Sequence, residues 1–397
     1  MATKVSLVKC GSYADTEVAG ALRSALAPFG GMAALVKPGQ KVLIKPNCLM
    51  GEAPEMAVTT HPTLIFAVVK EVIAAGGIAL VGDSPGNAHA NVVASMEKAG
   101  IKQAAEAAGG ALVPFQQGGI VKVKSPSGSS ILPEVPIAGP VLAADFVIDL
   151  PKLKTHGMTL YTGAIKNMFG CVPGFFKTEF HRLAPHPHDF ASLLVDVFAI
   201  SRPGLTIMDA VVGMEGAGPS HGTPRKLGAI IASTDGVAVD VIGSSLIGFD
   251  PLDIDMIKIA GERGLGNSNL EQIEVLGAAI AELRLTDWAR PDRLYKVLKR
   301  FPRLAGILAG FIAINPEIDQ QKCVKCLVCL KSCPAKTIKM HPHPLSPSPL
   351  PRGKGNKGLG VYIDLKNCIH CFCCHELCQY DAVKLKSSWL ARLMGVA

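Results

Sequence analysis

Aromatic side chains are scarce in this sequence: phenylalanine, tyrosine and tryptophan together make up 5% of its 397 residues. Surfaces that bind RNA or single-stranded DNA usually stack the bases on aromatic rings. Basic segments with interleaved aromatic residues, another common sign of nucleic-acid binding, are also missing. The composition therefore argues against a nucleic-acid partner.

Long apolar stretches are missing as well. The longest one, residues 304–314, is about half of the roughly 20 residues that a membrane-spanning helix needs. Neither a secretion signal nor a twin-arginine motif precedes the first strand-like segment, Val5–Val8. We therefore expect a protein that is not transmembrane and that lies in the reducing cytoplasm, where its 12 cysteines would not form a disulfide framework.

Eight of these cysteines form two matching runs near the C-terminus. Each run has the spacing C-x2-C-x2-C-x3-C, and Pro334 follows the first. This is the bacterial spacing for two [4Fe–4S] clusters, in which the fourth cysteine of each run binds the other cluster. The pattern predicts two ligand sets: Cys323, Cys326, Cys329 and Cys378 for one cluster, and Cys368, Cys371, Cys374 and Cys333 for the other.

Other uses of cysteine explain these runs less well. A structural zinc site needs only four ligands and accepts histidine, and the radical S-adenosylmethionine enzymes use C-x3-C-x2-C instead. Over residues 316–387 the sequence resembles the two-cluster bacterial ferredoxins. It departs from them at Gln379, which replaces the proline expected after the last cysteine, and at Cys373, an extra thiol that could substitute for a neighbouring ligand.

Upstream of the cysteine runs, short apolar segments alternate with helical ones. We predict strands at residues 42–44, 78–81, 146–150, 205–208 and 227–231, and helices at 64–74, 192–200, 237–246 and 251–262. Apolar strands that alternate with helices indicate a mostly parallel sheet covered on both faces. The predicted fold class is therefore α/β, followed by an α+β ferredoxin-like domain.

The domains that we predict are an α/β domain at residues 1–283, a basic helical connector at 284–315 and the ferredoxin-like domain at 316–397. A segment near 341–360, crowded with Pro, Gly and Ser, predicts a disordered insertion. From Arg284 onward, 19 basic residues outnumber 7 acidic ones, and part of this excess offsets the charge of thiolate-bound clusters. The rest could dock an acidic electron-transfer partner or an anionic membrane surface. It consists of Arg290, Arg293, Lys296, Lys299, Arg300 and Arg303.

Polar motifs follow several of the predicted strands, which is where open α/β sheets bind ligands. In chain order they include Lys45–Asn47, Thr59–Pro62, Gly82–Gly86, Lys152–His156 and Gly163–Gly170. Their order resembles the bacterial and archaeal family called domain of unknown function 362, which is often fused to a ferredoxin tail of this kind. The resemblance implies the architecture and leaves the substrate open.

Within these motifs, basic and amide side chains predict a site for a carboxylate or phosphate. The predicted substrate-binding residues are Lys45, Asn47, Asp83, Lys152, Lys154, Asn167 and Glu215. The candidate catalytic residues are His61, His156 and Lys166. An imidazole titrates near neutral pH, and either a histidine or a lysine would supply the proton. Simpler roles stay open: His61 could cap a helix, and each lysine could lie in solvent.

Two further groups of residues have weaker signals. A histidine-dense segment raises a metal site, although its spacing fits neither zinc nor non-haem iron; it contains His181, His186, His188 and Asp189. Cys10, Cys48 and Cys171 are expected to be buried small residues, with a reactive thiolate at Cys48 as the alternative.

These observations predict an iron–sulfur oxidoreductase. Electrons would pass between a soluble donor or acceptor and an anionic small molecule in the α/β domain, through two [4Fe–4S] clusters. One alternative is a non-catalytic electron carrier or maturation factor that docks on a redox partner. Another is a metal-cofactor isomerase that the clusters activate, given some architectural similarity to nickel-dependent lactate racemase.

Overall fold

The chain forms two compact units, Met1–Ala289 and Arg290–Ala397. The computed structural model describes residues 3–86, 91–174, 176–291, 314–340 and 360–387. Of the predicted basic residues before the clusters, only Arg290 belongs to these ranges; Arg293, Lys296, Lys299, Arg300 and Arg303 lie outside them, as do residues 341–359 of the predicted insertion. The predicted connector and insertion therefore stay predictions. Among the helices of the described ranges, none has the length and apolar character to cross a bilayer.

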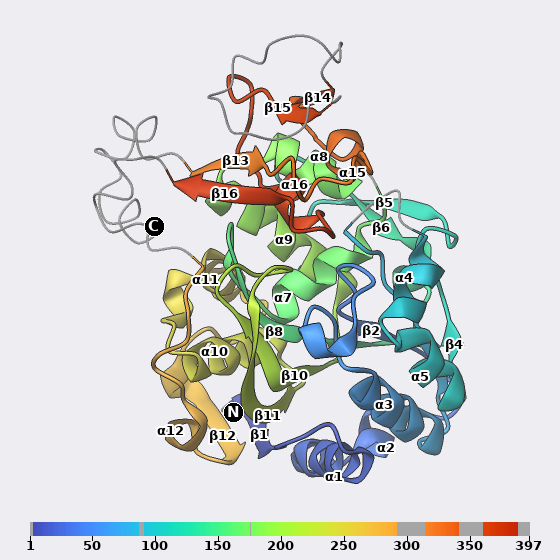
Figure 1. The fold of residues 1–397 in the computed structure, drawn as a ribbon. Coiled ribbons are helices and arrows are strands. Elements are labelled where there is room, and N and C mark those ends of the chain that lie inside the picture. Colours follow the sequence, from blue (N-terminus) through green and yellow to red (C-terminus); the bar gives the residue numbers. More distant parts are fainter. Residues whose placement is uncertain (1–2, 87–90, 175, 292–313, 341–359, 388–397) are drawn as a thin grey trace. The chain divides into compact units, whose positions relative to one another are not determined.

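One ten-stranded sheet organises the first unit (Figure 1). Its strands are β1 (Thr3–Lys9), β2 (Lys41–Pro46), β3 (Ile78–Val81), β4 (Ala111–Leu112), β7 (Phe146–Leu150), β8 (Lys152–His156), β9 (Leu160–Thr162), β10 (Leu205–Glu215), β11 (Thr223–Ser233) and β12 (Ile273–Gly277). The order is β12-β1-β11-β10-β7-β2-β3-β4, and β8 joins β10 to β9. Pairs are parallel except β1–β11, β10–β11 and β8–β9. The predicted, mostly parallel α/β fold is confirmed.

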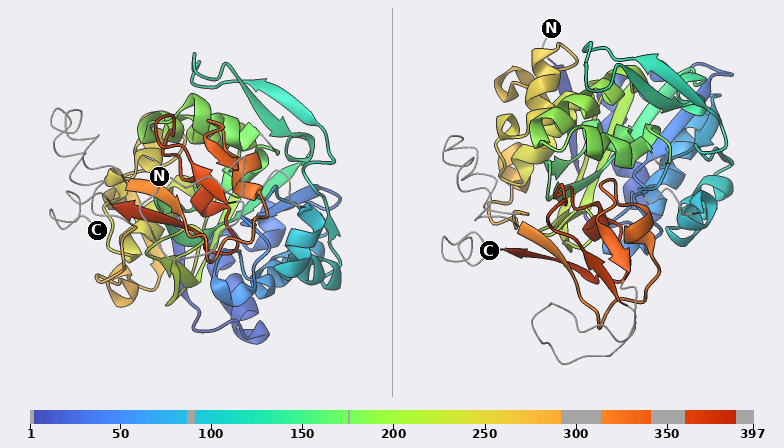
Figure 2. Two further views of the ribbon diagram at one scale, coloured as in Figure 1. Left: turned by 45° about the horizontal axis from the view of Figure 1, so that its top comes forward. Right: turned by 90° about the horizontal axis from the view of Figure 1, so that it is seen from above.

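Helices cover both faces of this sheet. They are α1 (Asp15–Leu26), α2 (Met32–Leu35), α3 (Pro62–Ala74), α4 (Val92–Lys98), α5 (Ile101–Ala107), α6 (Gly139–Leu142), α7 (Ala164–Asn167), α8 (Phe176–Leu183), α9 (Pro187–Ser201), α10 (Gly236–Leu246), α11 (Asp255–Glu262) and α12 (Ile280–Leu283). Figures 1 and 2 show α1, α3 and α5 on one face and α9, α10 and α11 on the other. A separate antiparallel hairpin joins β5 (Ile120–Lys124) to β6 (Glu134–Ala138).

Because side chains alternate along the strands, two charged side chains of β2 and β7 point toward α7. Ile44 of β2 and Ile148 of β7 belong to the apolar core that also contains Leu22 of α1. Successive residues of a strand point to opposite faces. Lys45 and Asp149, which follow these two isoleucines, therefore point to the other face, where α7 lies.

One of the polar motifs is itself a strand. We expected residues 152–156 to be a polar segment beyond β7, but they form β8, and all five of its residues are buried. The charges of Lys152, Lys154 and His156 concealed this strand, because buried charges normally require partners that a local pattern does not reveal. These three residues are therefore inside the first unit and not on a solvent-exposed loop.

The second unit is a small α+β structure, as predicted. It contains β13 (Ile314–Ile318), β14 (Ile338–Met340), β15 (Val361–Ile363), β16 (Val383–Ser387), α15 (Val328–Lys331) and α16 (Cys373–Glu376). β13 pairs with β16 and β14 with β15, both antiparallel. Ile318, Ile338, Val361 and Val383 form its core, against which five of the cysteines pack: Cys323, Cys329, Cys333, Cys374 and Cys378.

Candidate functional site

The carboxyl ends of β1, β2, β3, β7 and β10 share one edge of the sheet, because these strands all run in the same direction. Two of the predicted motifs begin here: Lys45–Asn47 at the end of β2 and Gly82–Gly86 after β3. Parallel sheets bind ligands at this edge. The predicted site residues are therefore expected to lie at this edge.

Lys45 is neutralised inside the first unit. Its Nζ lies 2.8 Å from Asp83 Oδ1, and both side chains are almost fully buried. The same ammonium donates to the Pro46 carbonyl at 2.9 Å and to Asn167 Oδ1 at 3.3 Å. The structure thus brings three predicted site residues together, but the positive charge of Lys45 is balanced by Asp83 and not left for a ligand.

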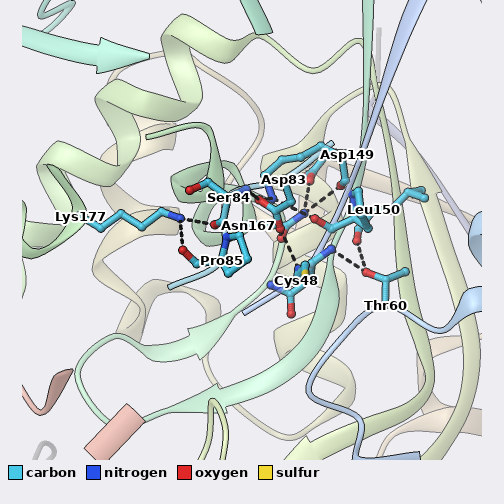
Figure 3. Close-up of polar contacts among 12 residues, drawn as sticks. Cys48, Thr60, Asp83, Ser84, Pro85, Asp149, Leu150, Asn167 and Lys177 are labelled. Atoms are coloured by element: carbon cyan, nitrogen blue, oxygen red, sulfur yellow. Dashed lines mark hydrogen bonds and ion pairs between the residues drawn. The ribbon is translucent and has the colours of Figure 1, made fainter. Parts of the chain in front are cut away.

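Asp83 also holds the surrounding backbone (Figure 3). Its carboxylate accepts hydrogen bonds from the backbone N–H of Cys48 at 2.7 Å and of Ser84 at 2.8 Å. A Cβ atom at Gly170 would lie 2.1 Å from Asp83 Oδ1 and 2.5 Å from Lys45 Nζ. Any larger residue at position 170 would displace the ion pair, which explains why the Gly163–Gly170 motif ends in glycine.

Asn167 connects this pair to a second carboxyl group. Its Nδ2 donates to Asp149 Oδ1 at 2.7 Å and to the Lys45 carbonyl at 3.2 Å. Burial raises the pKa of Asp149 well above its usual range, which favours the protonated, neutral acid. Nearby, Thr60 donates to the Leu150 carbonyl at 2.6 Å and accepts from Asn47 N at 2.8 Å, so it ties the ends of β2 and β7 together.

Lys177, on α8, is a buried basic residue beside the Gly82–Gly86 motif, and the sequence analysis missed it. Its buried ammonium donates to the backbone carbonyls of Ser84 and Pro85, the latter at 3.1 Å (Figure 3). Burial lowers the pKa of Lys177 to about 7, Asp83 partly opposes this shift, and Lys45 adds to it. The lysine lies in a helix with no motif around it, so no local signal could have identified it.

A second buried group lies at the same edge and is centred on Asp209 of β10. Its carboxylate accepts from Tyr13 Oη at 2.7 Å, from Lys152 Nζ at 2.9 Å and from the backbone N–H of His61 at 2.9 Å. Lys152 Nζ also donates to Tyr13 Oη at 2.7 Å. Lys152 is therefore a partner of an internal carboxylate, like Lys45. The one available signal was an aspartate inside the apolar run of β10.

His61 caps α3, as its alternative role predicted. Its Nδ1 accepts from the backbone N–H of Thr63 at 3.3 Å, and its ring stacks on Tyr13 with 3.6 Å between the centroids. Burial lowers the pKa of His61, so the ring is neutral at pH 7. With Nδ1 serving as acceptor, the neutral ring carries its proton on Nε2 and can donate from there.

The other predicted residues have separate surroundings. Lys154 Nζ donates to the Val58 carbonyl at 2.9 Å, and Lys166 Nζ lies 4.9 Å from the centre of the Phe169 ring. His156 Nδ1 accepts from two backbone N–H groups of the following turn, at 3.1 and 3.3 Å. Burial lowers the pKa of His156 well below its usual range, which keeps this imidazole neutral.

Glu215, at the end of β10, takes part in a partly exposed ion pair. Its Oε2 lies 2.8 Å from Arg225 Nη1 and accepts from the backbone N–H of Ala289 at 2.9 Å. Arg225 in turn contacts Asp287 at 2.6 Å.

The four predicted lysines do not form one anion-binding set. Lys45 and Lys152 pair with carboxylates, and Lys154 and Lys166 occupy different surroundings.

The histidine-dense segment does not bring its imidazoles to one place. His181 is buried and stacks on Phe190 with 4.3 Å between the centroids, whereas His186 and His188 are exposed. Within the described residues, His181 Nδ1 has no hydrogen-bond partner. Burial lowers the pKa of His181 to about 3, and the charge of Lys166 adds to the shift. His181 is therefore a neutral side chain of an aromatic cluster.

Replacing His181 by phenylalanine is expected to reduce the sensitivity of the fold to acid. An unfolded histidine takes up a proton below pH 6.5, while folded His181 does not until about pH 3, so its contribution is present above pH 6.5 and is lost as the pH falls. At pH 4.5 the loss from this one residue would be about 3 kcal/mol. Urea unfolding at pH 7 and pH 4.5 checks this, and equal losses in His181→Phe and the parent would contradict it.

The three upstream cysteines are buried, as expected. Burial raises the pKa of Cys10 to about 11 and that of Cys171 to about 12. Burial and the charge of Asp83 also raise the pKa of Cys48, so this residue is a neutral thiol at pH 7. The thiolate alternative for Cys48 therefore lacks support, although Lys45 is near.

The electrostatics of the second unit indicate which cysteines lie close together. Burial, together with the nearby thiols of Cys323, Cys326 and Cys378, raises the pKa of Cys329 to about 11. Because charge–charge interactions weaken with distance, these influences report proximity. Cys323, Cys326 and Cys378 are the three residues that the spacing places with Cys329 on one cluster.

The second predicted set is close together by the same criterion. Burial raises the pKa of Cys374 well above its usual range, and the thiols of Cys371, Cys368 and Cys333 from the same set, together with Cys329 from the first set, add to the shift. Burial also raises the pKa of Cys368, and the thiols of Cys371 and Cys333 add to this shift. Four thiolates in each group are a donor set that suits a [4Fe–4S] cluster.

Comparisons with known proteins agree with both units. Residues 42–245 match the domain of unknown function DUF362, and residues 322–382 match the 4Fe-4S dicluster domain. A thylakoid-associated protein of Synechocystis sp. is 34% identical over 305 residues, which cover 77% of this chain and 92% of that protein.

One solved structure, the lactate racemase apoprotein of Thermoanaerobacterium thermosaccharolyticum, aligns with a TM-score of 0.37 and 13% identity. The alignment covers 59% of this chain and 54% of the racemase chain, so this chain spans about half of that protein. This similarity is too low to carry an argument about fold or reaction. The matches over residues 42–245 and 322–382 are sufficient: the chain belongs to the DUF362 family and carries a 4Fe-4S dicluster domain that binds two [4Fe–4S] clusters.

Proposed function

We propose that this protein is an oxidoreductase that passes electrons through its two clusters to or from an anionic small molecule bound at the carboxyl edge of the α/β sheet. The dicluster domain implies electron transfer. The proposed ligands are Cys323, Cys326, Cys329 and Cys378 for one cluster and Cys368, Cys371, Cys374 and Cys333 for the other. The proximity of Cys323, Cys326 and Cys378 to Cys329, and of Cys368, Cys371 and Cys333 to Cys374, supports this assignment.

The charge balance around Asp83 is the observation that supports an anionic substrate. The Asp83 carboxylate pairs with Lys45, and its charge also favours the protonated form of Lys177. Burial favours the neutral form of Asp149. Two amines therefore share one carboxylate. An anion would balance the remaining charge in a place that is shielded from water, where charge pairing is strongest.

His61 is the proposed hydrogen-bond donor to the same ligand. It lies at the same edge of the sheet, is half-buried and is held by Tyr13 and by the backbone of Thr63. As a neutral imidazole it could donate from Nε2 and later exchange a proton. We propose no catalytic role for His156, whose burial and backbone contacts account for it.

Anion binding is expected to stabilise the parent protein but not the Lys177→Met variant. Because the pKa of Lys177 is about 7, a bound anion would also raise it and cause proton uptake near neutral pH. Thermal unfolding with added phosphate or small carboxylates measures the first effect, and calorimetry in buffers of different ionisation enthalpy measures the second. Lys226→Met, which removes an exposed lysine, is the matched control. Equal stabilisation of Lys177→Met and the parent would contradict the site.

The redox part of the proposal has its own test. Dithionite-reduced protein would be mixed with candidate anionic oxidants, and bleaching of the clusters would be followed by absorbance. Cys326→Ala and Cys371→Ala variants that remain folded are expected to lose this reoxidation. If both variants turn over a substrate at the full rate, the reaction of this protein does not require electron transfer through the clusters.

A further inference from the structure

The second unit is an internal repeat with an offset of 45 residues. Every cluster cysteine of the first run has its counterpart 45 positions later, as Cys323 has Cys368. The backbone repeats as well: non-glycine residues with positive φ occur in three matched pairs, Lys325 and His370, Leu327 and Phe372, and Lys336 and Asp381. Differences between equivalent positions therefore show how the two cluster environments differ.

One type of contact is the same in both halves. The backbone N–H of Thr337 donates to Cys333 Sγ at 3.3 Å, and the backbone N–H of Ala382 donates to Cys378 Sγ at 3.3 Å. Thr337 and Ala382 are equivalent positions of the repeat. These two hydrogen bonds thus contribute equally to the two ligand sets.

The side chains at these positions are different. Thr337 is buried, and its hydroxyl lies 3.4 Å from Cys333 Sγ and also hydrogen-bonds Cys368. A thiolate ligand carries no proton, so the hydroxyl must be the donor when the cluster is bound, and its one proton goes to one of these two sulfurs, both of which belong to the same ligand set. The methyl group of Ala382 offers no equivalent donor to the other set.

A second donor favours the same set. Cys373, at the first position of α16, is buried and its thiol hydrogen-bonds Cys371. Its counterpart in the repeat is Val328, at the first position of α15, which cannot donate. Both additional donors therefore reach thiols of one ligand set, that of Cys368, Cys371, Cys374 and Cys333.

We propose that the cluster bound by Cys368, Cys371, Cys374 and Cys333 has the higher reduction potential and is the one that receives the first electron. Hydrogen bonds to cluster sulfurs are among the factors that set the potential. A reduced cluster carries more negative charge, so a donor to its thiolates stabilises the reduced form more than the oxidised form. The inference rests on the ligand sets proposed above.

A potentiometric titration of the full chain, followed by EPR, tests this inference. The parent protein is expected to show two midpoints. Thr337→Val and Cys373→Val should each lower the upper midpoint, with a fall on the order of fivefold in the reduced-to-oxidised ratio at the parent's midpoint. Thr337→Ser, which keeps the hydroxyl, should leave it in place.

The repeat also provides the opposite changes. Ala382→Thr and Val328→Cys add the missing donors to the other half and should raise the lower midpoint. They keep the inference testable if a change at Thr337 prevents cluster assembly. Equal midpoints in the parent, or an upper midpoint that neither Thr337→Val nor Cys373→Val moves, would overturn it. Iron and sulfide analysis of the parent separates this inference from the proposed ligand sets. A parent that holds fewer than two clusters would contradict the ligand sets, and not the order of the two potentials.

Discussion

Removing Cys326 and Cys378 together is expected to leave one of the two clusters intact, whereas removing Cys371 and Cys378 together should leave none. In the crossed arrangement, Cys378 shares a cluster with Cys326, so the first double variant damages a single ligand set. The second double variant takes one ligand from each set. Iron and sulfide analysis of anaerobically purified protein should give about four of each for Cys326→Ala/Cys378→Ala, against about eight for the parent.

The control for this experiment is Cys373→Val, which removes a thiol outside both sets and should keep about eight iron. EPR of the dithionite-reduced variants gives a second measure, with the signal of an intact cluster in the first double variant and no such signal in the second. The reverse pattern would mean that each run of cysteines binds its own cluster. Loss of iron in Cys373→Val would instead identify Cys373 as a ligand.

Replacing Asp209 by alanine is expected to cost the fold about 3–5 kcal/mol. The Asp209–Lys152 pair is fully buried, with 2.9 Å between the charged atoms. Without the carboxylate, Lys152 remains as a buried cation, and Tyr13 Oη and the His61 N–H lose their acceptor. The measurement is the urea dependence of the far-ultraviolet circular dichroism of the first unit within the full chain.

The matched control is Glu215→Ala, on the same strand as Asp209. Its ion pair with Arg225 is partly exposed, and Arg225 keeps a second partner in Asp287. We expect a loss of about 1 kcal/mol or less from this change. If Asp209→Ala were no more destabilising than Glu215→Ala, the buried pair would contribute no more than a surface one.

Much of the architecture could be predicted because its signals are local. The cysteine spacing predicted both clusters, and the apolar segments at 42–44, 78–81 and 146–150 correspond to β2, β3 and β7. Such patterns depend on the geometry of a strand or on the reach of a few residues around a cluster. Both are properties of neighbouring positions, which the chain order displays directly.

The chemistry of the predicted lysines could not be obtained in this way. The sequence shows Lys45 and Lys152 as basic residues near strand ends, but their partners Asp83 and Asp209 are 38 and 57 positions away. Only the packing of β2, β3, β8 and β10 brings each pair within 2.9 Å. Lys177, without any motif, gains its importance from the same packing.

Chain order therefore predicts many of the strands and helices, the spacing of the candidate cluster cysteines and the family that the chain resembles. The charge state of a side chain depends on burial and on contacts between distant segments. In this protein the folded sheet turns two of the predicted anion-binding lysines into partners of internal carboxylates, and it leaves Lys177, Asp149 and His61 with shifted pKa values at its carboxyl edge. Those shifts arise from desolvation, which no local pattern of residues encodes.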